Sequence, residues 1–88
     1  MTTRETILAE LEDRFREVPV GKTHLSVRYE SAPRIARVGA CLARYEWDTR
    51  MEAIKTLLDF ERDHSDEFAL EFDVLPLDAV VDENFAEA

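Results

Sequence analysis

Gly21-Lys22-Thr23, the tripeptide that ends a phosphate-binding loop, is the first feature of the chain that could carry chemistry. Such a loop needs a second glycine five residues before the first one, and that position is Arg16. The motif also needs a strand before the loop and a helix after it, whereas the apolar pattern here indicates a helix first and a strand second. We therefore interpret the tripeptide as a helix-to-strand connector in which Gly21 ends the first helix.

A second candidate is the acidic run that begins at Asp59. Together with Glu61 and Asp63, it matches the first three ligand positions of a calcium loop. The sixth position, which requires glycine, is His64, and the twelfth, which requires a bidentate glutamate, is Leu70. The run is typical of a solvated acidic helix face, and the sequence predicts no metal site.

Catalytic groups are few and widely spaced. His24 and His64 lie outside any spaced cluster of ligands, and Ser26 and the single cysteine, Cys41, lack the local pattern of an activated nucleophile. We interpret Cys41 as a small buried apolar residue and His64 as a residue at a helix C-terminus. The sequence thus predicts no catalytic residue and no cofactor, and we expect a protein that is not an enzyme.

The elements that position these residues follow from the period of the apolar pattern. Residues 3–17 repeat apolar side chains at helical spacing, which predicts a first helix, and residues 24–30 alternate at strand spacing. A second helix is predicted from a cap at Asp48 or Thr49 to about His64. Its expected apolar stripe is formed by Met51, Ile54, Leu57 and Leu58. Residues 67–76 alternate again and predict a half-buried strand that Pro76 closes.

Residues 31–47 fit two structures. As a helix they would place Ile35, Val38, Leu42 and Tyr45 on one stripe. As a strand they would run through Tyr45 and Trp47 directly into the cap of the second helix, and Gly39 in the middle favours this interpretation.

The expected fold is a small single α+β domain of order αββαβ, with αβααβ as the alternative, whose short sheet is covered by helices on one face. The domain is expected to span residues 1–76, and residues 77–88 form an acidic tail, either a short docked helix or disordered.

The charge is unevenly distributed along a chain whose net charge is −9. Residues 21–50 carry six basic and three acidic side chains, whereas residues 51–88 carry two basic and twelve acidic ones. Such a segment repels nucleic acids and anionic membranes and attracts basic proteins. The chain shows no leader and no apolar run of membrane length, so we expect a cytoplasmic protein that binds neither nucleic acid nor membrane.

These observations predict a non-enzymatic protein-interaction module, such as a subunit, regulator or inhibitor, that engages a basic protein surface and forms a homodimer. One alternative is a nucleic-acid mimic that inhibits a nuclease or another nucleic-acid-binding protein. Another is a small ligand-binding or enzyme domain with a pocket at a dimer interface. The partner-binding candidates are acidic residues of the second helix and last strand together with apolar residues of the tail. They are Asp59, Asp63, Asp66, Glu67, Glu71, Asp73, Val80, Val81 and Phe85.

Overall fold

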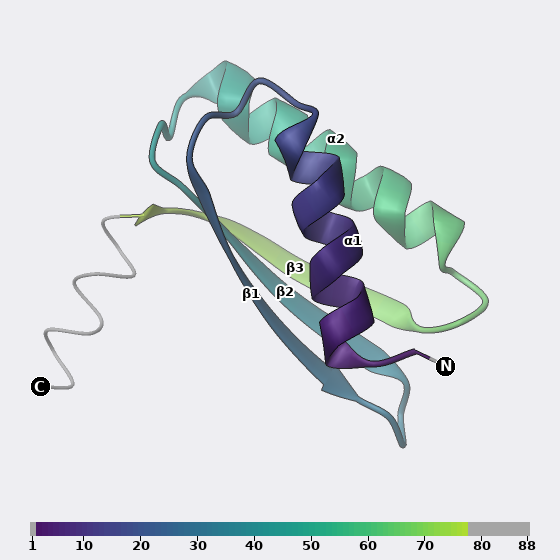
Figure 1. Ribbon diagram of the computed structural model, residues 1–88. Coiled ribbons are helices and arrows are strands. Elements are labelled where there is room, and N and C mark those ends of the chain that lie inside the picture. The colour runs from purple at the N-terminus through teal and green to yellow at the C-terminus, as the bar shows by residue number, and fades with distance from the viewer. Residues whose placement is uncertain (1, 78–88) are drawn as a thin grey trace, which may run out of the picture.

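The computed structural model describes residues 2–77 and has the predicted order αββαβ. The elements are α1 (Arg4–Arg16), β1 (Thr23–Glu30), β2 (Ile35–Leu42), α2 (Trp47–Asp63) and β3 (Ala69–Pro76). The strands form one sheet of order β1-β2-β3, in which β1 and β2 are antiparallel and β2 and β3 are parallel. Both helices cover the same face of this sheet, and the other face carries no element of the described chain (Figure 1). Residues 31–47, for which two structures were open, contain strand β2 at Ile35–Leu42 and no helix before Trp47.

The core lies between the helices and the covered face of the sheet. Strand alternation directs Leu25, Val27 and Tyr29 of β1 inward, while His24, Ser26 and Arg28 lie exposed on the other face. The registers align these inward positions with Ala36, Val38 and Ala40 of β2 and with Leu70, Phe72 and Val74 of β3. The largest fully buried side chains include Leu11, Leu42, Leu57 and Phe60. Cys41 is buried as expected, with 3% of its surface exposed.

The expected bounds of several elements are corrected by the capping contacts. The N-cap of α1 is Thr3, whose hydroxyl accepts a hydrogen bond from the backbone N–H of Thr6 at 3.2 Å. That helix ends at Arg16, so Gly21 belongs to the connector, where its φ of 76° is the left-handed conformation that glycine tolerates. Strand β2 ends at Leu42, and α2 begins at Trp47 after an N-cap at Glu46.

The expected apolar stripe of α2 was wrong for Met51 and Leu58, which are exposed, and Ile54 is half-buried. The residues that α2 buries are Thr49, Ala53, Thr56, Leu57 and Phe60. Burial of the threonines is tolerated because their hydroxyls donate to backbone carbonyls, Thr49 to Arg44 at 2.6 Å and Thr56 to Glu52 at 2.8 Å. Leu57 is the one stripe member that is fully buried, and Met51 and Leu58 are 38% and 48% exposed.

Candidate interaction surface

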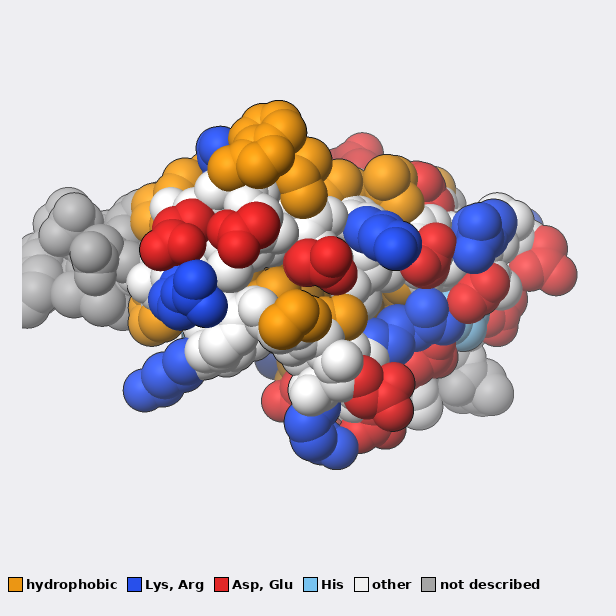
Figure 2. Space-filling view, turned by 90° about the horizontal axis from the view of Figure 1, so that it is seen from above, with side chains coloured by type: hydrophobic (Ala, Val, Ile, Leu, Met, Phe, Trp, Pro, Cys, Tyr) orange, Lys and Arg blue, Asp and Glu red, His pale blue; other side chains and the backbone are white. Residues whose placement is uncertain are grey.

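A row of apolar side chains runs along the outer side of α2. It contains Trp47, Met51, Ile54 and Leu58, which we call the α2 ridge, and Trp47 is 69% exposed. The spacing of four, three and four residues keeps the row on one side of the helix. Figure 2 shows hydrophobic side chains gathered along one margin of the helix-covered side of the molecule. The ridge exists because α2 carries two apolar sets, and the one that contains Ala53, Leu57 and Phe60 is buried, which leaves the other on the surface.

Arg50 fixes the aromatic end of the ridge. Its guanidinium carbon lies 5.1 Å from the ring centroid of Tyr45 and 5.7 Å from that of Trp47, within the range of cation–π attraction. The Nε atom of Arg50 is buried and has no hydrogen-bond partner within the described chain. The Tyr45 hydroxyl donates a hydrogen bond to the carbonyl of Val74 at 3.4 Å, which ties this corner to the edge of β3. Tryptophan, tyrosine and arginine are the residue types that dominate protein–protein interface energies.

A shallow notch of about 220 Å³ separates the ridge from β3. Its lining includes Tyr45, Trp47, Arg50, Ile54 and Phe72. Pockets for small-molecule ligands usually enclose about 300 to 1,000 Å³. The notch is therefore better suited to receiving a side chain of a protein partner than to enclosing a ligand.

A cluster of ionisable groups lies at the other end of α2. The Nε2 atom of His64 is 3.0 Å from both carboxylate oxygens of Glu10, and its Nδ1 atom contacts a carboxylate oxygen of Glu67. Burial by itself lowers the pKa of His64, but the hydrogen bonds to Glu10 and Glu67 outweigh burial and raise it. Arg14 binds Glu10 at 2.8 Å and Asp63 at 2.7 Å.

This cluster has a structural explanation. A carboxylate at each ring nitrogen favours the doubly protonated imidazole, in which neither nitrogen can act as a base. The His64 ring also stacks on Phe68 at a centroid distance of 5.3 Å, which ties α2 to the start of β3. Burial by itself raises the pKa of Glu10, but the hydrogen bonds from His64 and Arg14 outweigh it and lower that pKa. The cluster therefore joins α1, α2 and β3 through charge-assisted hydrogen bonds.

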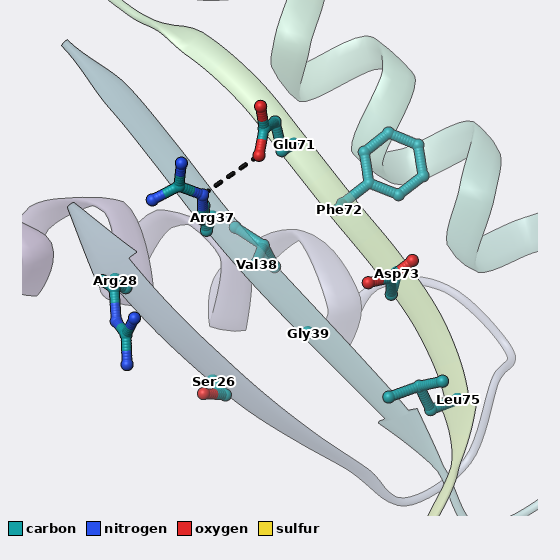
Figure 3. Close-up of a pocket in the computed structure, with 9 residues that line it drawn as sticks. All are labelled: Ser26, Arg28, Arg37, Val38, Gly39, Glu71, Phe72, Asp73 and Leu75. Carbon is teal, nitrogen blue, oxygen red and sulfur yellow. Dashed lines mark hydrogen bonds and ion pairs between the residues drawn. The ribbon is translucent and has the colours of Figure 1, made fainter. Parts of the chain in front are cut away.

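The uncovered face of the sheet is hollowed at Gly39, as Figure 3 shows. The hollow measures about 470 Å³, and its lining includes Arg28 from β1, Arg37 from β2 and Asp73 from β3. Arg37 is held by Glu30 at 2.5 Å and Glu71 at 3.0 Å, so its charge is already compensated. The described lining carries both signs of charge and no buried polar side chain aimed into the hollow, which gives a ligand little to bind specifically.

The acidic residues predicted to bind a partner are distributed over four places. Asp63 and Glu67 belong to the cluster around His64, and Glu71 and Asp73 lie on the uncovered face of the sheet. Asp59 pairs with Arg62 at 3.1 Å on α2, and Asp66 lies exposed in the turn before β3. The remaining candidates, Val80, Val81 and Phe85, lie outside the described residues. The fold thus does not join the six acids into one surface, and Figure 2 shows acidic and basic side chains intermixed on the helix-covered side.

The aromatic residues that lie near arginines in the sequence do not form a single surface either. Tyr29 faces the core and packs edge-on against Phe68 with 6.0 Å between ring centroids, whereas Tyr45 and Trp47 flank Arg50 at the start of α2.

Sequence reasoning missed the α2 ridge because it assigned Met51, Ile54 and Leu58 to the core. The signal that could have revealed it is the second apolar set of α2, formed by Ala53, Leu57 and Phe60.

Within residues 2–77, no three His, Cys, Asp or Glu side chains come together in a group that could hold a metal ion. Over the same residues, neither helix is long and apolar enough to cross a membrane. No protein-family model, curated protein or solved structure matches the chain.

Proposed function

We propose that the chain is a non-enzymatic protein-interaction module whose binding surface is the α2 ridge together with Tyr45 and Arg50 at its aromatic end. The observation that carries this proposal is the 69% exposure of Trp47 at the head of a row of apolar side chains on a surface helix. Scattered apolar residues are normal on protein surfaces, but a contiguous row beside a Trp–Arg–Tyr group is characteristic of an interface. The partner must therefore offer an apolar surface, with the exposed charges of α2 at the rim of the contact.

The predicted basic partner of the acidic residues remains a second hypothesis. Four of the six acids already bind a cation or His64 within the chain, namely Asp59, Asp63, Glu67 and Glu71. These ion pairs are exposed, so a basic partner would exchange one weak surface pair for another and gain little, which makes the ridge the stronger candidate.

A matched pair of variants tests the proposed surface. Met51→Glu places a charge in the middle of the ridge, and Ser65→Glu places the same charge at an exposed position beyond the end of α2. Circular dichroism should show that both variants fold, since neither position is buried. In affinity capture from the native source with quantitative mass spectrometry, the Met51→Glu chain should lose a partner, or a second copy of itself, that the Ser65→Glu chain retains. A captured set that is the same for both variants would contradict the proposal.

A further inference from the structure

The spacing of the α2 ridge is that of a short coiled-coil seam. Steps of four, three and four residues from Trp47 to Leu58 correspond to alternating d and a positions of a heptad. The row covers about three helical turns, or roughly 17 Å. A narrow seam of this kind packs best against another helix that carries the same spacing, and α2 of a second copy is such a helix.

Charged residues beside the seam indicate the orientation of that second helix. Asp48 and Lys55 are exposed and lie one heptad apart, on the flank of the seam opposite to Arg50, which lines the notch beside β3. Neither residue takes part in an ion pair within residues 2–77. An antiparallel arrangement with its two-fold axis between Met51 and Ile54 brings Asp48 of each chain beside Lys55 of the other. Both ion pairs form at once because the contact is isologous.

The parallel arrangement lacks this complementarity. It would bring Lys55 of one chain toward Arg50 of the other, since these residues occupy the two opposite flanks of the seam. Like charges across a helix interface are unfavourable. The antiparallel arrangement also sets Trp47 against Leu58 of the other copy, so the largest exposed side chain of the ridge is covered.

The edge of β3 is a poorer site for self-association. An antiparallel pairing of β3 with its copy around Phe72 would place Glu71 and Asp73 beside Asp73 and Glu71 of the second chain, and like charges directly opposite destabilise a sheet. One outward carbonyl of this edge, that of Val74, already accepts a hydrogen bond from Tyr45. The edge of β1 is blunted similarly, because Arg4 Nε donates to the carbonyl of Val27 at 2.8 Å.

We propose that the partner of the α2 ridge is a second copy of this chain, bound through antiparallel packing of the two α2 helices with reciprocal Asp48–Lys55 ion pairs. This inference rests on the proposed function and names its partner. The dimer is expected at micromolar concentrations.

A charge-swap series on the full chain tests the arrangement by sedimentation equilibrium. The wild-type chain should show twice its mass of 10.2 kDa, and Met51→Glu should show the single mass. Asp48→Lys and Lys55→Asp should each weaken dimerisation roughly tenfold, because each replaces two attractive pairs with two repulsive ones. The double variant restores opposite charges and should dimerise about as tightly as the wild type. A double variant as weak as the single ones would overturn the antiparallel arrangement.

Two further outcomes would overturn the inference and separate it from the proposed function. If the chain stays monomeric over the micromolar range while Met51→Glu still abolishes capture of a different protein, the ridge binds that protein and only the second copy is wrong. Trp47 is the single tryptophan, so its fluorescence reports directly on the ridge. If its emission indicates a buried ring at every concentration and shifts to the red in Phe85→Glu, the tail occupies the ridge, and both proposals fail.

Discussion

The orientation of α2 is the feature on which the proposed surface depends, and the neighbours Leu57 and Leu58 test it. Leu57 is fully buried, whereas Leu58 is 48% exposed. Replacing leucine by alanine removes three carbons, worth about 2.4 kcal/mol at about 0.8 kcal/mol for each buried methylene group. The cavity left at Leu57 adds to this transfer term, so Leu57→Ala should lower the free energy of unfolding by about 2 to 5 kcal/mol. Leu58→Ala loses about half of the transfer term and leaves no closed cavity, so about 1 kcal/mol is expected.

Urea unfolding followed by circular dichroism measures both costs, at a chain concentration low enough that self-association contributes nothing. A domain of this length has a total stability of about 4 to 13 kcal/mol, so Leu57→Ala should shift the midpoint strongly or leave the chain unfolded. Leu58→Ala should leave a cooperative transition close to that of the wild type. If the two variants lost equal stability, α2 would be rotated about its axis relative to this structure, and the ridge would be part of the core.

Three other predictions concern charge and backbone conformation. The pKa of His64 is raised in the folded chain, so the stability that its contacts with Glu10 and Glu67 contribute is fully present below the unfolded pKa of about 6.5 and is lost as the pH rises through the folded value. Denaturation of wild-type and His64→Asn chains between pH 6 and 9 should show this decline in the wild type alone. Gly39→Ala should stabilise the chain by about 0.5 to 1 kcal/mol, since the added carbon would meet its nearest neighbour at an ordinary contact distance of 3.8 Å. Gly21→Ala should cost about 1 to 2 kcal/mol, because Gly21 has a positive φ that alanine disfavours. Equal melting temperatures for the two variants would contradict this prediction. The melting temperature of the wild-type chain should rise with sodium chloride because salt screens the net charge of −9, and a flat or falling curve would mean that the ion pairs of the fold already compensate it.

The sequence by itself determined the types of the elements outside residues 31–47 and favoured their observed order. Alternation at residues 24–30 and 67–76 predicted β1 and β3. The helical spacing of Ile7, Leu8, Leu11 and Phe15 predicted α1. These patterns are reliable because a strand or helix that covers one side of a single core must repeat its apolar residues at its own period. Gly39 favoured a strand for residues 31–47, and β2 confirms that interpretation up to Leu42.

Tertiary structure alone decided which side of α2 is buried and which charges meet. The helix carries two apolar sets, and the sequence could not show that two threonines would be buried beside one of them with their hydroxyls satisfied by the carbonyls of Arg44 and Glu52. The contact of Arg14 with Asp63 and that of His64 with Glu10 join residues about fifty positions apart along the chain, so no local pattern encodes them. The predicted acidic surface was divided for the same reason, because the partners of Asp63, Glu67 and Glu71 depend on how helices and strands pack rather than on the order of residues. Local periodicity fixes secondary structure, but the choice between two similar helix faces depends on side-chain contacts that exist only after the sheet has formed.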